Sequence, residues 1–136
     1  MDEIDFKILK LLTENAKISG KELGEKVHMT GQAVGNRIRR LEDEGIIIGY
    51  TVDVDKKIAG FPLTCYITAF LKSHHHKPFI KMVKGSEEII ELHRTSGEGC
   101  YMMKGNFRTH QDLNEFLEKL LVFADYKLAL SIEKIL

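Results

Sequence analysis

The chain has 136 residues, of which 43% are hydrophobic and 29% charged, and these proportions exclude a disordered or low-complexity chain. Twenty basic and twenty acidic side chains cancel, so net charge alone does not indicate a nucleic-acid partner. Residues 58–71 are the longest uncharged stretch, shorter than the about 20 apolar residues of a membrane span. The acidic start, Met1–Glu3, does not have the pattern of a secretory signal. Cys65 and Cys100 lie in alternating apolar segments, which favours buried thiols over a disulfide. We therefore expect a cytoplasmic protein with no membrane partner.

Three short helices are predicted in the first 45 residues. Apolar side chains repeat at helical spacing over residues 2–14 and again over 31–44. Ser19, three residues before Glu22, is a capping-box pattern that predicts a second helix ending near His28. The second and third helices are then separated by only about four residues, a length typical of a helix-turn-helix.

A strand and a linker are expected after the third helix. Residues 46–54 are rich in β-branched and aromatic side chains that end in alternation, which predicts a strand. The following glycine and proline indicate a linker. We expect a helix-turn-helix domain at 1–50, a strand and linker at 51–61, and a second domain at 62–136.

The second domain changes from helical to alternating periodicity. Its first strand has one strongly apolar face, and a Ser-Gly-Glu-Gly turn suggests that two later strands form a hairpin. The order β-α-β-β-α-β is that of the ferredoxin-like fold, with both helices on one face of the sheet. The sequence thus predicts an α+β protein, a winged helix-turn-helix followed by a βαββαβ domain. Its strands are expected at 63–72, 88–95, 100–107 and 126–135, and its helices at 77–84 and 109–121.

The sheet face away from the helices is expected to carry large apolar side chains. Such a face needs a cover, and two small domains gain stability by burial between subunits. We therefore expect a homo-oligomer, whether dimer, tetramer or octamer. The residues predicted on this open face are Tyr66, Thr68, Phe70, Tyr101 and Met103.

The third helix has a polar face opposite its apolar stripe. At about 100° per residue, the apolar residues fall together, and glutamine, asparagine and arginine fall on the far side. Gln and Asn can pair with adenine and Arg with guanine in the major groove of double-stranded DNA, although a solvated face is the simpler alternative. Arg37 lies nearer the stripe and is either a phosphate contact or an intradomain ion pair. Thr30 is an N-cap that could also donate to a phosphate. The predicted DNA contacts are Thr30, Gln32, Asn36, Arg37, Arg39 and Arg40.

The remaining motifs of the sequence bear on metal binding and catalysis. The run His74–His76 suggests a metal site, but three consecutive residues of a regular element cannot converge on one ion, so we expect a loop, no metal and no cofactor. No nucleotide-binding or nucleophile-elbow motif occurs, which argues against an enzyme. The alternative function is a small-molecule-binding or RNA-binding module of the α/β domain, in which Tyr66, Phe70 and Tyr101 would stack on bases.

The chain resembles the Lrp/AsnC family of bacterial and archaeal transcriptional regulators over essentially its whole length. That resemblance implies a helix-turn-helix joined to a ligand-sensing α/β domain, through which the family dimerises and often assembles into octamers. The matching segments are Asp2-Glu3-Ile4-Asp5 with Ile8 and Leu12, Glu22-Leu23-Gly24, Arg37-Ile38-Arg39-Arg40-Leu41-Glu42, Gly45-Ile46-Ile47, and Gly49-Tyr50-Thr51 with Asp53 and Gly60.

One position departs from the family pattern. In the family, a glycine-containing turn leads into an aspartate and an aromatic residue, and the region contributes to an amino-acid pocket between dimers. Here Cys100 stands where that aspartate is expected, and a neutral thiol is a weak partner for a ligand ammonium. Glu98 could substitute, but it lies two residues earlier on the turn. The resemblance therefore implies an effector region of Gly97, Glu98, Gly99 and Cys100, and we expect a weak or absent response to free amino acids.

Overall fold

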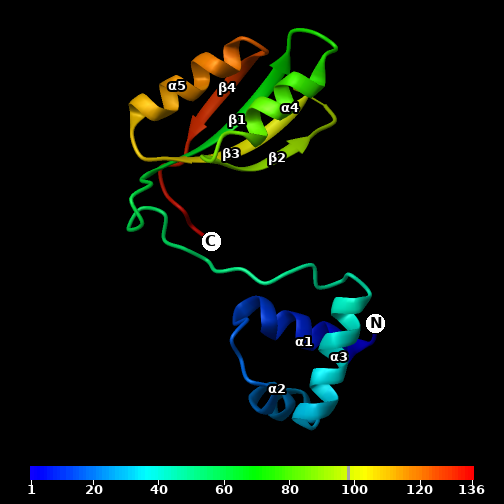
Figure 1. The fold of residues 1–136 in the computed structure, drawn as a ribbon. Helices are drawn as coiled ribbons and strands as arrows, with labels where there is room; N and C mark the ends of the chain where they lie inside the picture. Colours follow the sequence, from blue (N-terminus) through cyan, green and yellow to red (C-terminus); the bar gives the residue numbers. More distant parts are fainter. Residues whose placement is uncertain (98) are drawn as a thin grey trace. The chain divides into compact units, whose positions relative to one another are not determined.

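The computed structural model describes residues 1–97 and 99–136, which form two compact units, Met1–Asp53 and Val54–Leu136. The first unit contains three helices, and the second contains a sheet and two helices; Figure 1 shows the path of the chain through these elements. None of the helices in the described part of the chain has both the length and the hydropathy needed to cross a bilayer.

The first unit contains the three helices that the sequence predicts, α1 (Glu3–Glu14), α2 (Gly20–Val27) and α3 (Gly31–Asp43). Each begins at a side-chain cap, because the first amides of a helix have no partner inside it. The caps are Asp2, Ser19 and Thr30, whose oxygens accept from the amides of Asp5, Glu22 and Ala33. The helices enclose a small core that includes Ile8, Leu23, Val27 and Val34.

The prediction of a strand over residues 46–54 is wrong. This segment has neither helix nor strand conformation, and Ile48 and Val52 are 95% and 76% exposed. A strand is stabilised by hydrogen bonds to a neighbouring strand, and no strand of residues 1–97 or 99–136 pairs with this segment. The alternating side chains favour β-strand conformation, but they do not show whether a neighbouring strand is available for pairing.

The second unit is the predicted βαββαβ domain. Its four strands form an antiparallel sheet in the order β2-β3-β1-β4, and Figure 1 shows both helices on the same side of it. The last strand begins two residues before the expected start and ends at Leu130, because its partner strand begins only at Leu63, after a proline. The elements are β1 (Leu63–Leu71), α4 (His76–Lys84), β2 (Ile89–Arg94), β3 (Tyr101–Phe107), α5 (His110–Leu121) and β4 (Ala124–Leu130).

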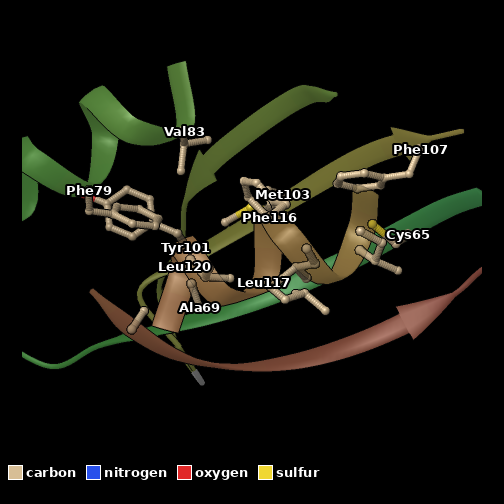
Figure 2. Packing of buried hydrophobic residues seen from close by; sticks show 13 residues of the cluster. Cys65, Ala69, Phe79, Val83, Tyr101, Met103, Phe107, Phe116, Leu117 and Leu120 are labelled. Atoms are coloured by element: carbon tan, nitrogen blue, oxygen red, sulfur yellow. The ribbon is translucent and has the colours of Figure 1, made fainter. Parts of the chain in front are cut away.

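The register of β3 contradicts the prediction that Tyr101 and Met103 lie on the open face of the sheet. Tyr101 pairs with Ala69, and Met103 with Ile67, so both β3 side chains face the helices and are only 3% exposed. Figure 2 shows Tyr101 and Met103 in the core with residues of α4 and α5. Tyr66, at 45% exposed, remains on the open face as expected.

The error has a simple cause. A one-residue slip moves every side chain of a strand to the opposite face, and β3 begins with three consecutive apolar residues, so alternation could not determine the phase. The backbone decides it, because the Cys100 amide donates to the Ala69 carbonyl. Met102, 46% exposed, takes the place on the open face.

Candidate nucleic-acid interface

The outward face of α3 is polar, as the helical wheel predicts. Val34 and Leu41 are fully buried on the inner side of the helix. Gln32, Asn36 and Arg39 are exposed. Asn36 thus lies about one helical turn after Gln32, and Arg39 about two turns after it, so the three side chains share one accessible surface.

The N-terminal end of α3 is held by Thr30. Its hydroxyl oxygen accepts a hydrogen bond from the Ala33 amide at 3.1 Å, so the expected capping role is present. Because a hydroxyl both accepts and donates, this bond leaves the Thr30 proton able to donate to a phosphate at the helix N-terminus.

Arg37 lies on the other flank of α3 and is paired within its own domain. Its Nη1 atom is 2.8 Å from Asp2 Oδ2 and 2.9 Å from Asp5 Oδ1. Of the two roles left open by the sequence, the structure shows the intradomain ion pair. The two carboxylates raise the pKa of the Arg37 guanidinium.

Arg40 also faces α1 rather than open solvent alone. Its Nη2 atom is 2.5 Å from Asp5 Oδ2, and its Nε atom is 3.9 Å from Glu44 Oε1. Arg40 is nevertheless half exposed, whereas the Asp5 side chain is 1% exposed. The guanidinium therefore has one side against α1 and one side accessible.

Asp2, Asp5, Arg37 and Arg40 form a cluster of ion pairs with Asp5 at its centre. The pairing of Asp5 with α3 was not predicted from the sequence. A hydrogen bond from the Asp2 amide lowers the pKa of Asp5 to about 2, with further lowering from Arg37 and Arg40. Asp5 also lies one helical turn before the buried Ile8. An acidic residue inside an apolar stripe was the available signal, since a buried carboxylate needs a partner.

The cluster defines which part of α3 is available to a partner. Asp2 and Asp5 engage Arg37 and Arg40 on one flank. In the described part of the chain, no hydrogen bond or ion pair holds the Arg39 guanidinium. Arg39, with Gln32 and Asn36, is thus the set whose hydrogen-bonding groups remain accessible.

The turn assigned to an effector lies in the second unit. Gly97 and Gly99 both have positive φ, 87° and 82°, which glycine adopts without strain. Glu98, also assigned to this region, lies outside the described residues. Cys100 is a half-buried free thiol.

Cys100 lines a pocket of about 510 Å³ together with the loop after β1. Antiparallel pairing of β1 with β3 brings this loop, which includes His74–His76, beside the turn. The His76 Nδ1 atom lies 2.8 Å from the Tyr101 hydroxyl. Across residues 1–97 and 99–136, no three His, Cys, Asp or Glu side chains are placed to hold a metal ion.

Comparison with known families agrees with both units. Residues 1–48 match the model described as winged helix-turn-helix DNA-binding. Residues 64–132 match the Lrp/AsnC ligand binding domain. The chain belongs to the Lrp/AsnC family.

Relatives in the Lrp/AsnC family match the chain along nearly its whole length. The HTH-type transcriptional regulator LrpB of Bacillus subtilis is 45% identical over 99% of this chain and 91% of its own. LrpA of the same organism is 35% identical over 98% and 99%. The relatives are transcriptional regulators and not enzymes, and this Lrp/AsnC chain is a DNA-binding transcriptional regulator.

Solved structures of the family share the fold. B. subtilis LrpC superposes with a TM-score of 0.93 at 30% identity, covering 99% of this chain and 96% of its own. A Neisseria meningitidis regulator solved as a complex with L-Met has a TM-score of 0.91 over 99% and 92% of the two chains, and at 23% identity it shows the fold alone.

Proposed function

We propose that the protein binds specific duplex DNA sequences by inserting α3 into the major groove. Gln32, Asn36 and Arg39 would contact base edges there. The observation that carries the proposal is the accessible hydrogen-bonding face of α3, opposite the buried side of the helix. Amide and guanidinium groups of this kind form bidentate pairs with adenine and guanine.

The remaining predicted contacts have supporting roles in this proposal. Thr30, at the helix N-terminus, and the accessible side of Arg40 would contact phosphates, which position a protein without specifying sequence. Arg37 would orient α3 through Asp2 and Asp5. Contacts to phosphates should appear in the salt dependence of binding, and contacts to bases in the ratio of specific to non-specific affinity.

A salt titration tests the proposal directly. Binding of the full-length protein to a duplex, selected from a random library, is compared with binding to single-stranded RNA of equal length. We expect tighter binding to the duplex at every salt concentration. Preference for the RNA would favour the alternative, stacking of bases on the sheet aromatics Tyr66 and Phe70.

We further propose that the protein is a homo-oligomer joined through the open face of the sheet. Tyr66 and Met102 are about half exposed on this face. Lys104 and Lys127 lie 5.8 Å and 5.7 Å from the ring centroids of Tyr66 and Phe70. A second copy of the protein would cover these large side chains. We expect this assembly to form in the cytoplasm, where the protein binds DNA. Analytical ultracentrifugation of the full-length protein measures the number of subunits.

We propose that the pocket beside Cys100 is the effector site. The family pattern implies a pocket for free amino acids, and we infer that the pocket of this protein does not bind them. Among the described residues, the pocket is lined by Leu71, Lys72, Ser73, His74–His76 and Cys100. Position 100 therefore presents a thiol in place of the carboxylate that would pair with a ligand ammonium. DNA binding would then be independent of amino acids or respond to another ligand.

Calorimetric titration with the twenty amino acids tests this proposal. We expect no low-micromolar binding by the wild type, and new or stronger binding by Cys100→Asp. Cys65→Ser is the matched thiol control, since Cys65 is buried in the sheet core and lies outside the pocket. A clear response of the wild type to leucine or another common amino acid would contradict the proposal.

A further inference from the structure

Two glycines of the helix-turn-helix lie close to backbone atoms of neighbouring segments of the first unit. A Cβ atom on Gly24 would overlap the Met29 carbonyl oxygen, so a larger residue would push α2 away from the turn. A Cβ on Gly31 would lie 3.4 Å from the backbone of Gly20. Gly24 therefore has no room for a side chain, whereas a methyl group at Gly31 would be in van der Waals contact with the backbone of Gly20.

Gly35 has no such explanation. It lies in the interior of α3, and a Cβ atom there would meet no atom of the described residues within 4 Å, apart from the backbone of its own helix turn. Its φ is not positive, so the backbone conformation is open to any residue. Glycine in a helix interior is less stable than alanine because it loses more backbone freedom on folding. Within residues 1–97 and 99–136, neither packing nor backbone conformation therefore requires glycine here.

The position of Gly35 on the helix indicates what could require it. Gln32 precedes it by three residues and Arg39 follows it by four, so all three are surface neighbours. The opposite flank of α3 is engaged by Asp2 and Asp5. Gly35 therefore leaves a gap between two exposed polar side chains, on the flank that the ion pairs leave open.

We propose that Gly35 is a specificity-determining residue, whose missing side chain lets the backbone of α3 approach a base edge closely. The inference rests on the proposed base contacts of α3. Close approach of the backbone to a ligand is a use for which glycine is suited. The space left by one absent methyl group matches the C5-methyl of thymine, which marks a T·A pair in the major groove.

The test uses the full-length protein and a duplex selected with the wild type from a random library. We expect Gly35→Ala to bind this duplex at least ten-fold more weakly, and Gly35→Leu more weakly still. Affinity for a scrambled duplex of equal length should stay within two-fold. The melting temperature of Gly35→Ala should rise, because alanine favours the helix. Replacing the contacted thymine of the site by uracil should weaken the wild type and strengthen Gly35→Ala, because it removes the C5-methyl that the added alanine methyl would meet.

Control variants separate the possible failures. Gly85→Ala, in the other unit, adds a Cβ at ordinary distances of 3.5 Å and 3.6 Å from backbone oxygens, and it should not change DNA binding. Wild-type affinity of Gly35→Ala for the selected duplex overturns the inference, as does an equal loss on both duplexes. If Gln32→Ala and Asn36→Ala also bind normally, the proposed base-contacting face has failed as well. If those two weaken binding while Gly35→Ala does not, only the inference about Gly35 has failed.

Discussion

Replacing Arg39 by alanine should weaken sequence-specific DNA binding without destabilising the fold. The side chain is exposed on α3 and makes no hydrogen bond or ion pair with the described residues. Exposed substitutions of this kind usually change stability by less than about 0.5 kcal/mol. A bidentate arginine–guanine pair contributes about 1–3 kcal/mol of discrimination, which corresponds to a loss of about 5- to 150-fold at 1.4 kcal/mol per factor of ten.

The assay is fluorescence anisotropy with a selected and a scrambled duplex at several salt concentrations. If Arg39 contacts a base, the affinity for the selected duplex falls and the ratio between the duplexes shrinks. If it contacts only a phosphate, both affinities fall alike and the salt slope decreases by about 0.9. Lys119→Ala, an exposed cation of α5, is the matched control. Unchanged binding by Arg39→Ala would refute the assignment of the α3 face.

Arg40→Ala provides the contrast that the structure makes possible. Its guanidinium contacts the buried Asp5 carboxylate, and removing one partner of a buried charge destabilises the fold. We expect Arg40→Ala to lower the melting temperature, which Arg39→Ala should not do. Equal melting temperatures for the two variants would contradict the ion-pair geometry.

Three further predictions concern the two units separately. The pKa of Asp5 is about 2 against an ordinary 3.8, so its ionised form stabilises the first unit above about pH 4, and this contribution is lost as pH falls toward 2. Asp5→Asn should flatten that part of an acid titration followed by circular dichroism. An unaltered titration curve for Asp5→Asn would count against this role of Asp5. Phe79→Ala should destabilise the second unit by about 3–5 kcal/mol, because Phe79 is fully buried against Tyr101; denaturant unfolding with a loss below about 1 kcal/mol would contradict this packing. Residues 62–136 alone should remain at least dimeric at micromolar concentration, since the open sheet face lies there, and a monomer in sedimentation equilibrium would disprove the proposed interface.

The helices and most of the strands could be predicted because their signals are local. The capping side chains Ser19 and Thr30 lie three residues from the amides they bind. The inward and outward faces of α3 follow from the helical period alone. The sequence by itself therefore determined the helix-turn-helix, the βαββαβ order and the exposed Gln32, Asn36 and Arg39.

Tertiary structure decided the features that depend on distant residues. Arg37 and Arg40 pair with Asp5 across 32 and 35 positions of sequence, a contact that no local spacing encodes. The face of Tyr101 depends on its register with β1, and residues 46–54 form no strand because the described chain offers no neighbour. In each case the sequence carries the local tendency, whereas the outcome depends on which partner the fold brings within hydrogen-bonding or ion-pairing distance.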